Sequence, residues 1–372
     1  MHTRSTAHAV GVSIAVGIGV ATACARTSTP RMTSSIDGRS VDSLFNAYDG
    51  AGVPGAGVLV VQDGKTVLAR SYGMADLEAH IASDDQTNYR LASLTKQFTA
   101  TAILLLVKDG RLSLDDRLRD ILPDVPAYAS EVRIRHLLTH TSGLWAYEDF
   151  VPDSQKTQVH DRDVPALIAH AESLYFSPGS AYRYSNTAYA LLALVVERRA
   201  GMPFARFLRE RIFQPLGMQS TVAYEAAVST VPHRAFGYSL NGDAFSRTDQ
   251  SSTSAVLGDG GVYSSLHDLA LWDRALDSRV LLGENAQQAA WTDTRLNDGT
   301  RSRYGFGWFV DNAGEDLRVS HHGETMGFTN FILKYPRRRL TVIVLTNRTG
   351  GAPWDLAADV ARMVAQTVDG RR

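Results

Sequence analysis

Cysteine is almost absent from this chain, since Cys24 is the only one among 372 residues. A single thiol excludes an internal disulfide framework. An excess of charge of one sign is absent too, because 38 basic and 39 acidic side chains leave a net charge of −1. The largest basic run is three arginines at 337–339, which we expect in a solvated turn between two strands. The composition therefore gives no indication of a nucleic-acid partner.

Long hydrophobic runs are also scarce, apart from one near the start. The segment 9–20 is apolar, but it is too short and too rich in glycine to span a bilayer comfortably. Arg4 precedes it, and Ala21-Thr22-Ala23 follows it as a small-residue cleavage pattern. These features predict an export signal over residues 1–23 and hence a periplasmic or extracellular location.

Cys24 lies directly after the predicted cleavage site. Its thiol is therefore a candidate for lipid attachment, through which the protein would be anchored to a bacterial membrane. The resemblance to a bacterial lipoprotein signal is partial, because Ala21 stands where leucine is commoner. Cleavage without a lipid is the alternative. The polar, proline-bearing residues that follow predict a tether over 24–38.

Two widespread catalytic signatures are missing. No Gly-x-Ser-x-Gly occurs in the chain, which argues against an α/β-hydrolase. His136 and His140 have the spacing of a metal pair on a helix, but no glutamate follows His136 to make a zinc-protease signature. We therefore expect neither a metal site nor a cofactor.

The chain does show a pattern of strands at both ends and helices between them. The Asp63-Gly64 pair is a strong hairpin-turn signal. The expected elements are a helix at 41–48, strands at 57–61, 66–71, 317–321, 329–335 and 340–347, and a closing helix at 355–368. Strands from both ends favour one antiparallel sheet that is flanked by helices and carries an inserted, mostly helical subdomain.

This arrangement belongs to the α/β class in its broad sense, with helices and strands separated along the chain (α+β). We expect a single domain over 39–370. Its sheet part would come from 39–82 and 300–370, and its helical part from 83–299.

Ser93 and Lys96 open an apolar stretch that predicts a buried helix running towards Gly110. At positions i and i+3 they lie on one helical face, one turn apart. A neutral amine in that place can take the proton of the hydroxyl and make the serine a nucleophile. The partial positive charge of a helix N-terminus helps to keep the amine neutral. With 30 serines and 5 lysines in the chain, the spacing alone is weak evidence, and a capping serine beside a surface lysine is the alternative.

Two further triplets accompany this pair. Tyr184-Ser185-Asn186 precedes a helical run at 188–200, and His321-His322-Gly323 stands at the end of a predicted strand. Taken alone, the first triplet also fits a turn, and His321 also fits a buried core histidine.

In this order the three elements resemble the serine β-lactamase and penicillin-binding-protein superfamily, most of all the branch of class C β-lactamases, D-peptidases and related esterases. Other stretches similar to that family lie at 136–144, 178–186, 213–218, 260–270 and 321–328. The ordered set covers about residues 40–365 and is specific, although each triplet alone is not. The resemblance implies a β-lactamase/transpeptidase-like fold.

The resemblance also implies a role for each residue. Ser93 would be acylated, Lys96 would assist its deprotonation, and Tyr184 would shuttle a proton between the serine and the leaving group. Positive charge on Lys96 or His321 would stabilise the phenolate of Tyr184. The residues implied in substrate binding are Asn186, Gly323 and Glu324, with the backbone N–H groups of Ser93 and Glu324 as the oxyanion hole.

One departure from the family pattern bears on the substrate. β-Lactamases have a lysine at the first position of the third motif, where this chain has His321. Histidine is mostly neutral at pH 7 and therefore offers no permanent cation to a carboxylate. Arg348 is a candidate substitute cation, with a solvated arginine at a strand end as the alternative. The histidine form resembles the esterase and D-aminopeptidase-like members.

We therefore expect a serine hydrolase that acts through an acyl-enzyme on small esters, D-amino-acid peptides or related amides. A β-lactamase or a cell-wall D-alanyl-D-alanine carboxypeptidase is one alternative. A weakly acylating penicillin-binding or scaffold protein is another, because a fold by itself does not fix an activity. The expected partner in each case is a small ester, peptide or β-lactam.

Overall fold

A computed structural model describes residues 38–311 and 316–369. Cys24, the predicted export signal and nearly all of the predicted tether lie outside this part. Lipid attachment and export therefore stay predictions. None of the helices in the described ranges is long and apolar enough to cross a membrane.

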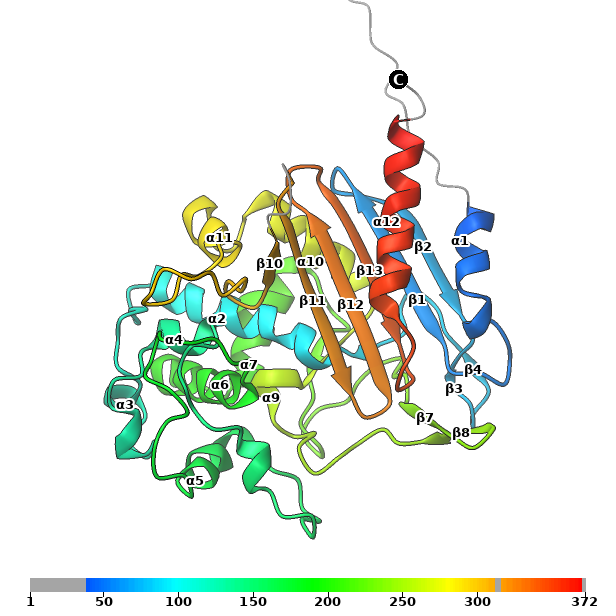
Figure 1. The fold of residues 1–372 in the computed structure, drawn as a ribbon. Coiled ribbons are helices and arrows are strands. Elements are labelled where there is room, and N and C mark those ends of the chain that lie inside the picture. The colour runs from blue at the N-terminus through cyan, green and yellow to red at the C-terminus, as the bar shows by residue number, and fades with distance from the viewer. Residues whose placement is uncertain (1–37, 312–315, 370–372) are drawn as a thin grey trace, which may run out of the picture. The chain divides into compact units, whose positions relative to one another are not determined.

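One six-stranded antiparallel sheet organises the described chain (Figure 1). Its strands, in spatial order, are β10 (Phe309–Asp311), β11 (Arg318–Thr325), β12 (Phe328–Tyr335), β13 (Leu340–Thr346), β1 (Ala56–Gln62) and β2 (Lys65–Tyr72). The central pairing joins the two ends of the chain, because β1 lies beside β13 with Ala56 opposite Thr346. The antiparallel sheet predicted from the sequence is thus confirmed.

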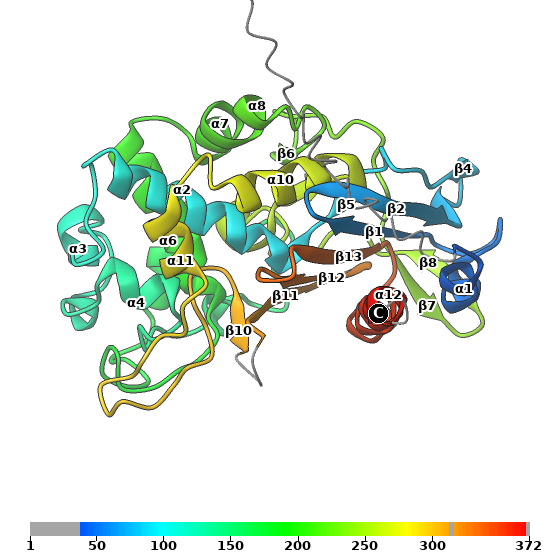
Figure 2. The same ribbon diagram turned by 90° about the horizontal axis from the view of Figure 1, so that it is seen from above.

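Helices cover both faces of the sheet (Figure 2). On β1, Val58 and Val60 pack in one core with α1 (Gly38–Leu44) and α12 (Pro353–Asp369). The alternate residues Leu59 and Val61 belong to the other, larger core, which holds α10 (Leu266–Ser278). Side chains on a strand alternate between faces, so an unbroken apolar run marks a strand that is buried on both sides.

The helical part is built around α2 (Lys96–Lys108), whose residues 96–106 are all buried. It packs against α6 (Asn186–Ala200) and α9 (Leu257–Gly260). The remaining helices are α3 (Leu118–Ile121), α4 (Ile134–Leu138), α5 (Val164–Ile168), α7 (Phe204–Leu208), α8 (Gln214–Leu216) and α11 (Glu284–Ala290). Shorter turns are η1 (Asn46–Tyr48), η2 (Ala92–Thr95), η3 (Ala127–Ala129), η4 (Tyr147–Phe150), η5 (Asp161–Asp163) and the π-turn η6 (Arg209–Phe213).

Three small sheets complete the described chain. They pair β3 (Met74–Asp76) with β4 (Ile81–Ala82), β7 (Tyr238–Asn241) with β8 (Ala244–Arg247), and β5 (Tyr89–Arg90) and β6 (Val222–Ala223) with β9 (Val262–Ser264). The β5–β9 pair leads directly into η2 and α2, and thereby fixes the start of α2.

Two boundaries near the third motif and the Ser93 motif differ from the sequence prediction. α2 begins at Lys96, so Ser93 lies in the preceding turn η2 and not in the helix. β11 continues to Thr325, which pairs with Phe328 across a tight turn that contains Gly327 at φ +77°. Glycine reaches this left-handed conformation without strain, which allows the strand to continue past His321.

A buried ion cluster attaches α10 to the sheet. The Nζ of Lys334 on β12 lies 2.8 Å from Asp273 Oδ1 and 2.6 Å from Asp277 Oδ1 on α10. The three side chains are 0%, 1% and 8% exposed. Removal of the cation would leave two buried carboxylates without a counter-charge, with the Thr341 hydroxyl still donating to Asp273.

Replacement of Lys334 by methionine is therefore expected to lower the free energy of unfolding by about 3–5 kcal/mol. Urea unfolding at neutral pH measures the change. The exposed Lys65→Met serves as the matched control and should change stability by less than about 0.5 kcal/mol. Equal, small effects of the two substitutions would show that the cluster contributes little.

Candidate active site

Ser93 lies in a turn that is held in an unusual backbone conformation. Ala92, directly before it, has φ +51°, a left-handed value that is costly for a residue with a Cβ. The surroundings enforce it: the Leu91 N–H donates to the Val262 carbonyl at 2.8 Å, and Asn330 Nδ2 donates to the Arg90 carbonyl at 2.8 Å. Strain of this kind is typical of functional sites. Here it leaves the Ser93 side chain partly exposed at the entrance to α2.

The amine of Lys96 is the centre of the hydrogen bonding around Ser93. It lies 3.0 Å from Ser93 Oγ, 2.9 Å from Asn186 Oδ1 and 2.8 Å from the Asp259 carbonyl. Burial lowers the pKa of Lys96 from 10.5 to about 8, although the carboxylates of Asp259 and Glu148 act in the opposite direction. The amine is therefore within reach of its neutral form near physiological pH.

The geometry also orients the neutral form of this amine. The oxygens of Asn186 and Asp259 can only accept hydrogen bonds, so they take the two protons of a neutral amine. The remaining lone pair then faces the hydroxyl of Ser93. This is the arrangement that a base needs to remove the proton of a serine.

Asn186 is held in the required orientation from both sides. It is the first residue of α6, and Ser185 caps that helix by accepting the N–H of Ala188 at 3.1 Å. The side-chain Nδ2 of Asn186 donates to Glu148 Oε1 at 2.7 Å, which turns its oxygen towards Lys96.

Tyr184 lies on the loop before α6, beside the amine. The Lys96 nitrogen is 4.9 Å from the centre of the Tyr184 ring. Its hydroxyl is buried and makes no hydrogen bond that the described residues account for, although the nearby Ser93 side chain favours the ionised form. Burial is the larger effect and raises the pKa of Tyr184 well above its usual 10, so the phenol is protonated at neutral pH.

His321 is fully buried, and both of its ring nitrogens have partners other than Ser93. Its Nδ1 lies 2.6 Å from the His322 carbonyl, which can only accept, so this nitrogen carries the proton. Its Nε2 then accepts the hydroxyl of Tyr304 at 2.9 Å. Burial lowers the pKa of His321 well below 6.5, which keeps the ring neutral. The ring centre of His321 is 6.1 Å from that of Tyr184, and the charge of Lys96 also acts to lower the pKa of His321.

Gly323 sets how closely β11 approaches the Ser93 turn. A Cβ at this position would lie 2.2 Å from the Leu91 carbonyl oxygen and 3.0 Å from Leu94 Cδ1. Any side chain would therefore push the strand away from η2. Glu324 follows on the exposed face of β11. The oxyanion hole of the Ser93 and Glu324 N–H groups stays a prediction.

A cavity of about 140 Å³ opens beside Ser93. Its lining residues are Arg90, Ala92, Ser93, Tyr147, Glu148, Asn186, Thr253, Asp259, Gly260, Glu324 and Thr325. The lining thus holds three carboxyl groups and one guanidinium. Arg90 is 3% exposed and donates to the Ser254 side chain and carbonyl at 2.6 and 2.9 Å.

Two of these carboxyl groups were not anticipated from the sequence. Asp259 contacts the hydroxyl of Tyr147 at 3.3 Å, and burial raises the pKa of Asp259 to about 7. Glu148 has one oxygen on Asn186 and the other buried without a hydrogen-bond partner in the described chain. Asp259 stands directly before the matched stretch at 260–270, but neither residue carries a pattern that would have marked it.

Three other residues weighed from the sequence do not have the roles considered for them there. The guanidinium of Arg348 stacks on Tyr48 at 3.7 Å and donates to the Ala47 carbonyl, so it is not the substitute cation. His136 and His140 each use Nδ1 to accept a backbone N–H, from Arg133 and Ser185 respectively. The two histidines therefore do not converge on one ligand.

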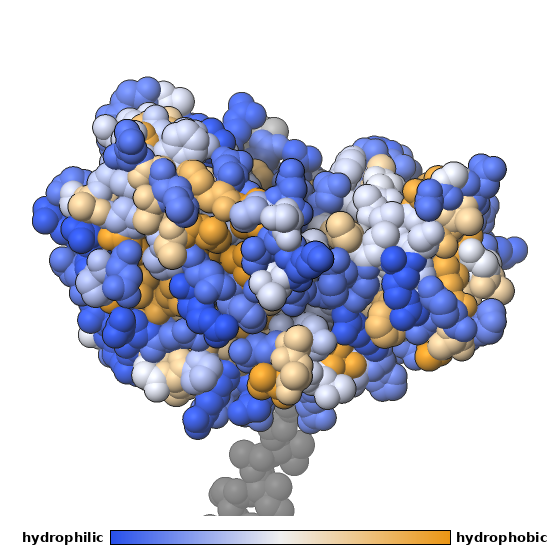
Figure 3. Space-filling model, turned by 90° about the horizontal axis from the view of Figure 1, so that it is seen from below, coloured by the Kyte–Doolittle hydropathy of each residue, from blue (hydrophilic) through white to orange (hydrophobic). Residues whose placement is uncertain are grey.

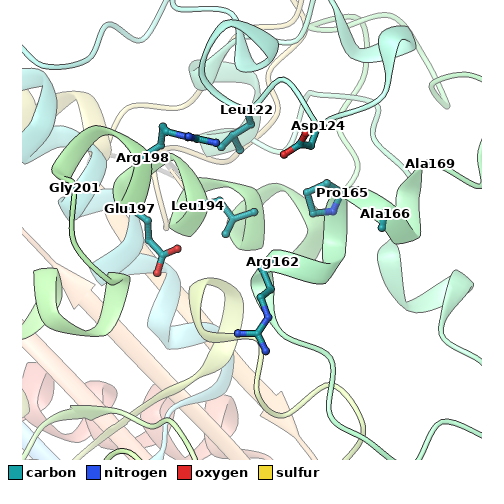
Figure 4. Close-up of a pocket in the computed structure, with 10 residues that line it drawn as sticks. All are labelled: Leu122, Asp124, Arg162, Pro165, Ala166, Ala169, Leu194, Glu197, Arg198 and Gly201. Carbon is teal, nitrogen blue, oxygen red and sulfur yellow. The ribbon is translucent and has the colours of Figure 1, made fainter.

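A larger cavity than the one at Ser93 lies elsewhere in the described structure. It has a volume of about 600 Å³, lies among α3, α5 and α6, and is lined by residues such as Leu122, Asp124 and Arg162 (Figure 4). It shares no lining residue with the cavity at Ser93. Figure 3 shows a mostly hydrophilic face on which hydrophobic residues gather towards the helical side. The nucleophile candidate Ser93 lines the smaller cavity and not the larger one.

Comparison with known proteins identifies the family of this chain. A family model described as Beta-lactamase matches residues 41–366. This chain belongs to that family. The match includes both ends of the sheet and every candidate residue from Ser93 to Glu324.

Individual relatives support the same assignment. The chain is 33% identical over 317 residues to Penicillin-binding protein 4* of Bacillus subtilis (strain 168), covering 81% of this chain and 69% of that protein. It is 28% identical over 313 residues to Protein flp of Staphylococcus aureus (strain N315), covering 79% of this chain but 60% of flp.

A crystal structure of a penicillin-binding protein from Bacillus halodurans superimposes with a TM-score of 0.76 and 28% identity, covering 87% of this chain and 99% of that one. The β-lactamase/transpeptidase-like fold expected from the sequence is thereby confirmed. The catalytic class is confirmed as well: this beta-lactamase family member is a serine hydrolase that acts through an acyl-enzyme.

Proposed function

We propose that Ser93 is the acylated residue and that neutral Lys96 is its base. The observation that supports this most is the lone pair of Lys96, which the oxygens of Asn186 and Asp259 leave facing Ser93. As the Ser93 oxygen bonds to the substrate carbonyl carbon, its proton moves to Lys96. Preorganised N–H donors of Ser93 and Glu324 would then hold the developing oxyanion.

Tyr184 completes the proton path in this proposal. Its protonated phenol donates to the departing alcohol or amine as the bond between the carbonyl carbon and that group breaks. The phenol then regains a proton from Lys96, which returns the base to its neutral form. Water attacks the ester on Ser93 by the same path in reverse, and releases the acid product and the free serine.

The cavity supports a small substrate whose acyl part carries an ammonium group. Its volume of about 140 Å³ is below the range of about 300–1,000 Å³ of drug-sized pockets. Among the side chains that line the cavity, the carboxyl groups of Glu148, Asp259 and Glu324 outnumber the single guanidinium of Arg90, even though burial raises the pKa of Asp259 to about 7. The terminal nitrogens of Arg90 are already bonded. Small amino-acid amides, peptides and esters with a free amine fit this charge.

A β-lactam or a peptide with a terminal carboxylate fits the site less well. Such a substrate carries a negative charge, and the third motif holds the neutral His321 where β-lactamases hold a lysine. Glu324 adds negative charge on the exposed face of the same strand. We therefore place β-lactamase and carboxypeptidase activity second.

A matched pair of amides tests the substrate assignment. Alanine p-nitroanilide is expected to have at least about a tenfold higher kcat/KM than its N-acetyl form at pH 7, since a hydrogen bond to a charged group contributes about 1.5–3 kcal/mol. Both enantiomers are measured, with a chromogenic cephalosporin alongside. Glu148→Gln should bring the ratio between the free and acetylated amides close to one.

The ratio is its own control, because a general loss of activity affects both amides equally. A preference for the acetylated amide, or for the cephalosporin over both amides, would reject an ammonium-bearing substrate. Neither result would affect the assignment of Ser93 as nucleophile.

A further inference from the structure

His140 holds the segment that carries Tyr184 at two points, one on each side of the tyrosine. The Arg183 N–H donates to the His140 carbonyl at 2.9 Å, and the Ser185 N–H donates to His140 Nδ1 at 3.1 Å. The second bond joins residues that are 45 positions apart in the chain, and it connects the segment after α4 to the start of α6. One residue thus fixes the backbone before and after Tyr184.

The ring of His140 also packs directly on the phenol. Its centre is 4.3 Å from that of Tyr184, with an angle of 37° between the planes. The ring centres of Tyr189 and Tyr304 lie 5.0 and 4.5 Å from that of His140. His140 is 0% exposed, so these contacts leave it no room to move without displacing Tyr184.

The backbone of His140 shows that this placement is enforced. Its φ is +57°, a left-handed value that is costly for a residue with a bulky side chain. The conformation is what lets the carbonyl and the ring of one residue reach both Arg183 and Ser185. Its imidazole Nε2 is buried without a hydrogen-bond partner among the described residues, which adds a further cost.

The imidazole is held in one protonation state. Because Nδ1 accepts an N–H, the neutral ring carries its proton on Nε2. Burial lowers the pKa of His140 well below 6.5, and the charge of Lys96 adds to this effect. The acceptor for Ser185 is therefore available throughout the neutral and alkaline range.

We propose that His140 is the positioning residue of Tyr184: it holds the phenol where its hydroxyl reaches Ser93 and the leaving group. This inference rests on the proposed proton role of Tyr184. The hydrogen bonds of His140 go to the residues on either side of Tyr184, and its ring packs on the phenol, so we place its effect on the reaction in the position of that tyrosine. Misplacement of a catalytic group by about 1 Å can cost about 10²-fold in rate.

His136 provides a matched control within the same segment. Its Nδ1 also accepts a backbone N–H, from Arg133 at 3.1 Å, but this bond lies at the start of α4, away from Tyr184. His136→Leu therefore removes an equivalent bond without touching the loop of Tyr184.

The test is a set of kinetic measurements on a small ester, with folding checked by circular dichroism. His140→Leu is expected to lower kcat by about 10²-fold with KM within about threefold, whereas His136→Leu leaves kcat within about threefold. His140→Asn should recover at least about tenfold of that loss, because asparagine supplies an acceptor and tolerates a left-handed φ. If His140→Leu does not fold, His140→Gly takes its place, since glycine fits the same φ without strain.

A double-mutant cycle separates positioning from general destabilisation. In the Tyr184→Phe background, His140→Leu should cost less than about threefold, because the group that it positions is already gone. An equal loss in both backgrounds, or no recovery in His140→Asn, would overturn the inference. A near-normal rate of Tyr184→Phe alone would instead reject the proposed role of Tyr184.

Discussion

Ser93→Ala is expected to reduce turnover of a small nitrophenyl ester by at least about 10³-fold, the scale seen when a serine nucleophile is removed. The lone pair of Lys96 faces the Ser93 oxygen alone, because its two other partners are carbonyl oxygens that carry no proton to give. Steady-state rates measure the loss. Intact-protein mass during turnover should show an acyl adduct in the parent protein and none in the variant.

Two comparisons make this result decisive. Ser130→Ala, at an exposed serine, should keep full activity and shows that the substitution as such is harmless. A Ser93→Ala variant that keeps more than about a tenth of the activity would exclude Ser93 as the nucleophile. An adduct that forms in the parent protein and never clears would favour the weakly acylating penicillin-binding or scaffold alternative.

Lys96→Met is expected to lower kcat/KM by about 10²-fold or more, the scale of general-base catalysis. Methionine fills a similar volume in the fully buried position but has no lone pair for the proton of Ser93. The exposed Lys65→Met again serves as control and should leave the rate unchanged. A near-normal rate in Lys96→Met would reject lysine as the base.

The pH dependence of kcat/KM should reflect the titration of the Lys96 amine. Only neutral Lys96 can accept the proton, and burial lowers its pKa to about 8. The value of kcat/KM should therefore rise about tenfold per pH unit below that pKa and level off above it. Lys96→Met should lose this rise. A profile of the parent enzyme that is flat between pH 6 and 9 would contradict a lysine base.

The low pKa of Lys96 should also make the free energy of unfolding increase with pH. The pKa of Lys96 is lower in the folded chain than in the unfolded chain, so the unfolded chain binds more protons between pH 8 and 10.5. The contribution of Lys96 to the free energy of unfolding is therefore lowest below pH 8, and it increases as the pH rises from 8 to 10.5. Methionine does not titrate, so the free energy of unfolding of the parent protein relative to Lys96→Met should increase between pH 8 and 10.5. Urea unfolding of both proteins across this pH range measures the change.

The sequence was informative where periodicity and local turn chemistry decide structure. β1 and β2 were predicted from the two runs that flank the Asp63-Gly64 turn signal, and the observed strands exceed the predicted ones by one residue at either end. The Ser93 motif was recognised, but the turn that carries it was not predicted. The residues around Ala92 contain no pattern that indicates a left-handed backbone conformation at an alanine. That conformation depends on bonds from distant residues such as Val262 and Asn330.

The roles of the histidines show the same limit. His321 was recognised as part of a motif, and the spacing gave no sign that Tyr304 and the His322 carbonyl would occupy both its nitrogens. His140 was considered as half of a metal pair with His136. Its actual partner, the N–H of Ser185, is 45 residues away in the chain, so no local spacing could indicate it. Side-chain partners of this kind are set when helices pack, and not by local pattern.

The amino-acid sequence by itself determined the family, the antiparallel sheet built from both chain ends, and the pairing of a serine with a lysine one turn apart. These features depend on short-range periodicity and on ordered motifs. Tertiary structure alone decided the direction of the Lys96 lone pair and the placement of Glu148 and Asp259 around the cavity. It also decided the contacts by which His140 holds the segment of Tyr184. Charge and proton direction depend on burial and on partners far apart in the chain, which only packing brings together.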